Sequence, residues 1–135
     1  MREILFHGKR ADNGEWVEGD VLQTRYHSGH IEYQIMPQTP VSSAVPVLPE
    51  TVGQFTGLTD KNGKKIFEGD ICRFKRFNDV HIGKVVFNVT TASFIMWYQP
   101  IVGAYGEKAT QKMLLSVCDN IEVIGNIHDN PELLR

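Results

Sequence analysis

Short apolar runs bounded by glycine and asparagine dominate the chain and predict β-strands. Over residues 31–36, Ile31, Tyr33 and Ile35 alternate with polar residues, which is the pattern of a strand with one buried face. Residues 80–89 alternate in the same way, and residues 94–98 form a continuous apolar run that is typical of a strand buried on both faces. No long stretch has the apolar spacing of a helix. The pattern therefore predicts an all-β protein.

The distribution of proline predicts how these strands are grouped. Residues 37–50 hold four of the six prolines, and proline removes the N–H donors that a sheet interior needs. We therefore expect a proline-rich linker at 37–50, between an N-terminal β unit at 1–36 and a second domain at 51–135. About five short strands between residues 51 and 128 favour a small, strongly curved barrel. Pro131 after Asp129-Asn130 predicts a short C-terminal helical tail.

One phrase occurs twice, at residues 12–21 and again at residues 60–71. Both copies contain Asn-Gly followed by Glu-Gly-Asp and a β-branched residue. Asn-Gly predicts a tight turn, and the second glycine with its aspartate predicts another corner before a core strand. The alternative is a pair of acid sites for a metal or for catalysis, formed by Glu18, Asp20, Glu68 and Asp70. Turn chemistry already explains the aspartates, and no histidine or third acid has ligand spacing nearby.

Composition narrows the class of protein. The 135 residues include 14 lysines and arginines and 16 aspartates and glutamates, so the net charge is −2. Hydrophobic residues make up 41%, which excludes a disordered chain. The apolar runs are far shorter than the ~20 residues of a membrane helix, and the N-terminus does not fit a signal peptide. We therefore expect a cytoplasmic protein in which Cys72 and Cys118 are buried, reduced thiols.

Several phrases, in order along nearly the whole chain, resemble the YopX family of proteins encoded mainly by bacterial phages and prophages. They are residues 4–9, 14–17 and 19–20, then 51–58, 60–64 and 66–71, and finally 124–127 with 131–134. The family more often has tyrosine at the position of Phe67. The resemblance implies an all-β fold whose C-terminal part is an SH3-like barrel. It implies no activity, and it carries over no catalytic or binding residue.

A basic strand is the first candidate site. Residues 61–84 hold seven basic and three acidic residues, and the rest of the chain is net acidic. Arg73, Lys75 and Arg76 are interleaved with aromatic residues, and Lys84 lies on the strand expected to neighbour them. Such a surface can hold phosphates and stack bases, which suggests a nucleic-acid-binding site. The alternative is a solvated outer face whose charges protect the sheet against aggregation.

Other candidate chemistry is weak. His27 and His30 flank a turn without a cysteine partner, and we interpret them as polar turn residues and not as metal ligands. The sequence has no nucleophile elbow, zinc-protease motif or phosphate-binding glycine loop. We therefore predict no enzyme activity, no catalytic residue, no metal and no cofactor. Trp16, Trp97 and Tyr98 could line a peptide groove, although core packing explains Trp97 more simply.

These observations favour a non-enzymatic interaction protein of a phage or prophage that acts in the cytoplasm of the bacterial host. Its partner is expected to be another protein or a second copy of the chain, so that it forms a homo-oligomer. The alternative is a nucleic-acid-binding module that uses Arg73, Lys75, Arg76 and Lys84.

Overall fold

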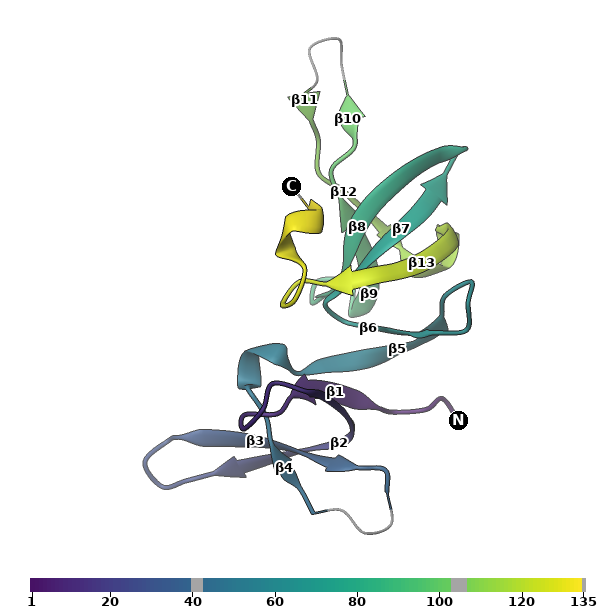
Figure 1. The fold of residues 1–135 in the computed structure, drawn as a ribbon. Coiled ribbons are helices and arrows are strands. Elements are labelled where there is room, and N and C mark those ends of the chain that lie inside the picture. The colour runs from purple at the N-terminus through teal and green to yellow at the C-terminus, as the bar shows by residue number, and fades with distance from the viewer. Residues whose placement is uncertain (40–42, 103–106, 135) are drawn as a thin grey trace. The chain divides into compact units, whose positions relative to one another are not determined.

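Antiparallel β-strands make up most of the computed structural model, which describes residues 1–39, 43–102 and 107–134 (Figure 1). The prediction of an all-β protein is confirmed. The chain divides into two compact units, Met1–Gly57 and Leu58–Arg135, which we call unit 1 and unit 2 and describe separately. No helix in the described part of the chain is both long enough and apolar enough to cross a membrane.

Unit 1 is an antiparallel sheet with the strand order β4-β3-β2-β1-β5. Its elements are β1 (Phe6–Lys9), β2 (Trp16–Arg25), β3 (Ile31–Pro37), β4 (Val45–Pro46), the 3-10 turn η1 (Pro49–Thr51) and β5 (Gly53–Thr59), which ends just beyond the unit boundary. The alternation predicted over residues 31–36 is the β3 strand, and Ile35 is fully buried there. Among the described residues of this unit, Leu5, Val47 and Phe55 are the other buried large apolar ones.

The proline-rich segment is part of unit 1. The sequence predicts a linker at 37–50, yet the described part of this segment contains β4 and the start of η1, and the compact units divide after Gly57. The hydroxyl of Thr51 accepts the N–H of Lys9 at 2.8 Å and donates to the carbonyl of Leu48 at 2.6 Å. Prolines fit here because β4 is an edge strand and because the first position of a 3-10 turn needs no N–H donor.

The two copies of the repeated phrase fold differently after their Asn-Gly turns. Gly14 and Gly63 both have positive φ (74° and 81°), so both predicted turns are confirmed. Gly69 also has positive φ (93°) and makes the predicted corner, whereas Gly19 lies inside β2. The corner predicted at Gly19 is therefore wrong. A Cβ atom at Gly19 would overlap the carbonyl oxygen of Met36 on β3, so close strand approach, not a turn, requires this glycine.

Unit 2 contains a five-stranded antiparallel sheet with the order β12-β9-β8-β7-β13. Its elements are β6 (Lys65–Phe67), β7 (Asp70–Arg76), β8 (Asp79–Asn88), β9 (Ser93–Tyr98), β10 (Ile101–Val102), β11 (Glu107–Lys108), β12 (Gln111–Leu114), η2 (Leu115–Val117), β13 (Asp119–Asn126) and η3 (Pro131–Leu134). β10 and β11 pair separately as a short ribbon.

The prediction of a closed SH3-like barrel is not supported. β12 and β13 form opposite edges of the five-stranded sheet, and among the described residues no strand joins them. The single 3-10 turn η2 leads from β12 to β13 without pairing the two. Two register shifts between β13 and β7 bend that edge, but the sheet stays open. The predicted helical tail is likewise only the four-residue 3-10 turn η3.

The core of unit 2 lies on one face of this sheet. It contains Phe74 and Cys72 from β7, Val85 from β8, and Met96 and Tyr98 from β9, together with Ile66, Leu115 and Cys118. Alternation along β7 points Cys72 and Phe74 toward this core and Arg73 and Lys75 to the opposite face. The opposite face is therefore the one that carries the predicted basic residues.

Candidate functional site

Antiparallel register brings three of the four predicted basic residues onto one face of the unit 2 sheet. Lys75 lies opposite Val80, Arg73 lies opposite Ile82, and Lys84 lies opposite Trp97. Residues directly opposite each other in an antiparallel pair point to the same face. Lys112 on β12 lies opposite Trp97 and extends the same row. We call these residues the outer face: Arg73, Lys75, Val80, Ile82, Lys84, Trp97 and Lys112.

Arg76 is the predicted basic residue that the structure does not place on the outer face. It alternates with Lys75 along β7, and its guanidinium lies over the ring of Phe77 at 4.0 Å from the ring centroid. Its Nε atom is buried and has no hydrogen-bond partner. Arg76 therefore does not contribute to the basic row, and its charge acts to lower the pKa of the Cys118 thiol, against the larger effect of burial.

The charges on the outer face are partly compensated. The guanidinium of Arg73 lies 3.4 Å from the carboxylate of Glu122 on β13, and Lys61 lies 3.3 Å from the same carboxylate. The ammonium of Lys84 lies 4.6 Å from the centroid of the Trp97 ring, which it covers as a cation–π contact. The row thus remains basic, but two of its cations already have partners within the unit.

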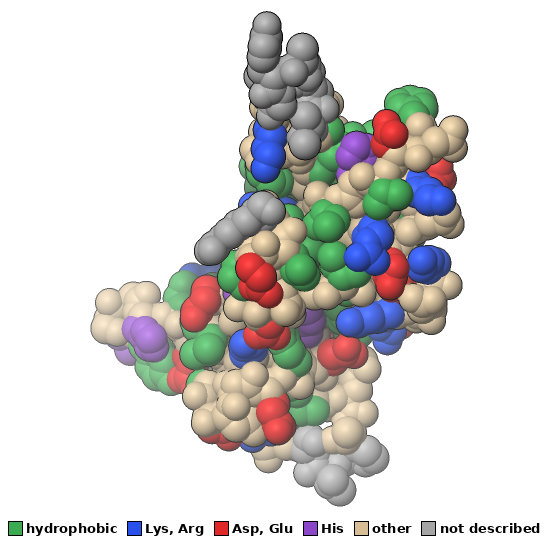
Figure 2. Space-filling model, turned by 45° about the horizontal axis from the view of Figure 1, so that its top comes forward, with side chains coloured by type: hydrophobic (Ala, Val, Ile, Leu, Met, Phe, Trp, Pro, Cys, Tyr) green, Lys and Arg blue, Asp and Glu red, His purple; other side chains and the backbone are tan. Residues whose placement is uncertain are grey.

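A groove of about 610 Å³ lies beside these residues on unit 2. Its apolar lining comes from Val80 and Ile82 on β8, Trp97 on β9, and Leu133 and Leu134 on η3. Val80 is 56% exposed and Ile82 is 39% exposed. Figure 2 shows apolar and basic side chains next to each other on this unit. A concave apolar lining with a polar rim is typical of a recognition site.

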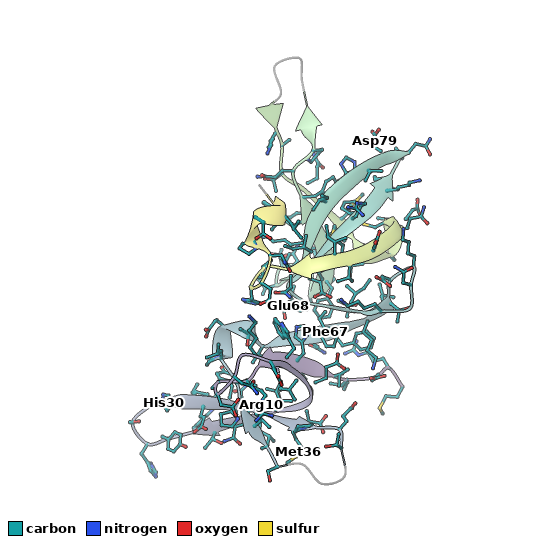
Figure 3. The ribbon with its side chains drawn as sticks, in the orientation of Figure 1. Arg10, His30, Met36, Phe67, Glu68 and Asp79 are labelled. Carbon is teal, nitrogen blue, oxygen red and sulfur yellow. The ribbon has the colours of Figure 1, made fainter. Side chains whose placement is uncertain are left out.

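One acid and one cation lie at the rim of the groove. Asp79 begins β8 at the end of the β7–β8 hairpin, and Lys108 ends β11 (Figure 3 labels Asp79). His81 also lines the groove, and its ring lies 4.9 Å from that of Tyr98 and 5.6 Å from that of Phe74. Phe74 and Tyr98 meet edge to face at 5.0 Å. Through these contacts, His81 of the groove packs against two aromatic residues of the core.

The aspartates of the second repeated phrase are held by backbone amides. Asp60 accepts the N–H groups of Asn62, Lys64 and Val123, each at 2.9 Å. Burial raises the pKa of Asp60, but these three donors outweigh it and lower the pKa below its usual value. Asp70 accepts the N–H of Phe67, which Figure 3 labels, at 2.8 Å. Turn chemistry therefore accounts for both carboxylates.

Burial raises the pKa values of three further groups, Asp70, Cys72 and Cys118. It raises the pKa of Asp70 to about 7, because one hydrogen bond does not replace the lost hydration. Burial also raises the pKa of the Cys72 thiol, and it raises that of Cys118 to about 11. Both thiols are free and buried, as the sequence predicts. Within the described ranges, no group of three histidine, cysteine or acidic residues is arranged to hold a metal ion.

The aromatic and histidine candidates are separated by the fold. Trp97 is half-buried on the outer face and lines the groove, so core packing, the simpler explanation that the sequence suggests, does not account for it. Trp16 belongs to unit 1, where its ring lies 4.4 Å from that of His7, and Tyr98 is in the unit 2 core. His27 and His30 lie at the tip of the β2–β3 hairpin, where His30 stacks on Tyr26 at 5.6 Å.

Sequence reasoning missed most of the groove. Val80 and Ile82 are visible as alternating apolar residues, but only the packing of η3 on β8 shows that Leu133 and Leu134 join them. Phe77 was also missed, because a bulky aromatic residue is not a sequence signal for a tight turn. In the structure the turn residues with positive φ are Phe77 and Asn78, at 51° and 68°.

Comparison with known proteins finds a family that matches nearly the whole chain. A family model described as YopX protein matches residues 5–135. A solved structure, "Crystal structure of protein EF1440 from Enterococcus faecalis", is similar to this chain with a TM-score of 0.54 and 23% identity, covering 100% of both chains. That likeness concerns the fold alone. No curated protein matches.

Proposed function

The chain belongs to the YopX family, and we propose that it acts as a non-enzymatic protein-interaction module of a phage or prophage, in the cytoplasm of the bacterial host, with the outer face of unit 2 as its binding surface. The observation that carries this proposal is the groove of about 610 Å³, in which exposed Val80 and Ile82 lie beside Trp97. When a partner covers apolar side chains that are accessible in a concave site, the free energy of the system falls, which favours binding.

The charges around the groove favour a protein over a polyanion. A partner with a few acidic side chains beside apolar ones would meet Lys75, Lys84 and Lys112 while filling the groove. Glu122 contacts Arg73, and the whole chain is net negative, so long-range attraction of a polyanion is weak. Electrostatic complementarity at this face would set partner choice and association rate more than affinity.

The test is a peptide selection that depends on the groove. A displayed library of random peptides is selected on the purified chain, and the selected peptides are then tested for binding to I82R, which puts a charge into the apolar lining. We expect peptides with apolar and acidic residues whose binding, measured by fluorescence anisotropy, is lost with I82R. V89R is the matched control, because Val89 is 83% exposed and does not line the groove.

Retained folding of I82R is checked by circular dichroism and by its melting temperature. If no peptide binds in an Ile82-dependent way, the groove is not a protein-binding site. If the selected peptides bind I82R and wild type equally, the surface is elsewhere on the molecule and the proposal fails.

Nucleic-acid binding is the second candidate, because register does bring Arg73, Lys75 and Lys84 onto one face. Arg76 would contribute only indirectly, through Phe77. This function predicts salt-sensitive binding of single-stranded DNA or RNA that R73E and K75E weaken. Absence of any anisotropy change with either nucleic acid at low salt excludes it.

A further inference from the structure

The tip of the β7–β8 hairpin displays an aromatic side chain at a costly position. Phe77 and Asn78 both have positive φ, as a two-residue hairpin turn of this type requires. Glycine and asparagine tolerate that conformation, whereas a bulky residue is strained in it. Phe77 is nevertheless there, and it is 79% exposed. A strained phenyl ring that is mostly exposed to solvent buries little apolar surface in the folded chain, which points to a function.

The ring is also held in place. The guanidinium of Arg76 lies 4.0 Å from the ring centroid and covers one of its faces. Phe77 is 79% exposed, so most of its ring remains open to solvent at the end of the hairpin. A preorganised aromatic side chain of this kind is typical of the anchor residues that dominate protein interfaces.

The groove that could receive such an anchor is lined partly by the same hairpin. The strand that follows the turn supplies Asp79, Val80 and His81 to the groove, with Ile82 next along β8. The groove volume of about 610 Å³ is several times that of a phenyl ring. Unit 2 therefore carries an apolar projection and an apolar hollow on one continuous surface.

A surface with both features is complementary to itself. In a two-fold symmetric dimer, if residue i of one copy contacts residue j of the other, then j also contacts i. The groove rim fits this arrangement because it carries both signs of charge, Asp79 and Lys108. Asp79 lies two residues from Phe77, so it would arrive beside the cation of the other copy when the ring enters the groove.

We propose that Phe77 of one copy inserts into the groove of a second copy, and the reverse, to form a symmetric dimer. This inference rests on the proposed function, since it uses the same surface, and it names the occupant as a second copy of this chain. The interface is centred on Phe77, Val80, Ile82 and Trp97, with Leu133 and Leu134 as the opposite wall.

Sedimentation equilibrium of the full chain, from roughly 5 to roughly 500 μM, tests the proposal over the range expected for a small interface. Wild type is expected to be a dimer at the upper concentrations, and F77A a monomer throughout. F77G is the sharper variant, because glycine relieves the positive-φ strain. At the lowest concentration, where wild type is also monomeric, F77G should melt at a higher temperature than wild type, and it should stay monomeric at the highest. V89A, which removes an equally exposed apolar side chain, should dimerise as wild type does.

Photo-crosslinking identifies the contact. With p-benzoylphenylalanine at position 77, irradiation should give a covalent dimer whose adducts map to residues 80–82, 97–100 and 133–134. Mixing ¹⁵N-labelled and unlabelled chains shows that the link joins two copies. An F77G or F77A protein that still dimerises, or adducts confined to other residues, overturns the proposal. A monomeric wild type that binds peptides through Ile82 overturns the dimer alone, and loss of both removes the proposed function too.

Discussion

The carboxylate of Asp60 accepts the backbone N–H of Val123 at 2.9 Å, across 63 residues of sequence. The same side chain closes its own turn through Asn62 and Lys64. Asp60 therefore ties the start of unit 2 to its last strand, β13, and the adjacent bond from the N–H of Lys61 to the carbonyl of Ile121 reinforces the link. Since β13 borders β7, this tie also supports the strand that carries Arg73 and Lys75.

We expect D60A to destabilise the protein by about 2–3 kcal/mol, because it removes the acceptor of three partly buried backbone amides at once. Urea unfolding, followed by circular dichroism, measures the change. D12A is the matched control, since Asp12 begins the first copy of the repeated phrase but is exposed and forms its ion pair with the nearby Arg10. An unfolding midpoint for D60A that equals that of D12A would show that the tie carries no stability.

Asp70 predicts a pH dependence. Burial raises its folded-state pKa to about 7, above the unfolded value of 3.8. The folded state then binds more protons than the unfolded state between these values, so its contribution to stability is complete below about pH 4 and is lost as the pH rises to about 7. The loss is at most about 4 kcal/mol. The melting temperature of D70N should therefore fall less than that of wild type between pH 4.5 and pH 7.5.

Asp60 does not interfere with this experiment. Its pKa is lowered, so the stability that it contributes is present above its unfolded value of 3.8 and is lost only at lower pH. Parallel pH profiles of wild type and D70N across the whole range would mean that Asp70 is ionised normally in the folded protein.

Gly19 predicts a packing effect in unit 1. A methyl group at this position would overlap the carbonyl oxygen of Met36, so β2 and β3 would have to separate. We expect G19A to lower the free energy of unfolding by about 2 kcal/mol or more. E18A, at the exposed neighbouring position, should leave it unchanged. Equal unfolding midpoints for the two variants would show that the strands accommodate a side chain at Gly19.

The cysteines predict low reactivity. The thiolate is the nucleophile, and burial raises the pKa of both thiols. In the native protein at neutral pH, iodoacetamide should label Cys118 slowly and Cys72 more slowly still, with both reaching the free-thiol rate in urea. Single C72S and C118S variants assign the two rates. Rapid labelling of native Cys72 would contradict its burial.

Local periodicity accounts for much of what the sequence predicts correctly. Alternation alone puts Arg73 and Lys75 on one face and Cys72 and Phe74 on the other. The apolar residues over 31–36 likewise predict β3, and Asn-Gly predicts the turns at Gly14 and Gly63. These features depend on residues that are close together in the sequence, so they can be predicted from the sequence of one protein.

The remaining features depend on contacts between distant residues. The same Glu-Gly-Asp sequence forms a corner at Gly69 and a straight strand at Gly19. The difference arises because β3 lies against Gly19 and not against Gly69. The expected barrel stays open since η2 connects β12 to β13 without pairing them. Leu133 and Leu134 join the groove through packing of η3 on β8, which no local pattern encodes.

The central claim is that the groove of unit 2 receives Phe77 of a second copy. The indole N–H signal of Trp97 in a two-dimensional ¹⁵N–¹H spectrum reports on it directly, with W16F used to assign the resonance. On dilution from roughly 500 to roughly 5 μM, this signal should shift in wild type and stay fixed in F77G. A Trp97 signal that does not move with concentration in wild type, or that moves equally in F77G, would contradict the account.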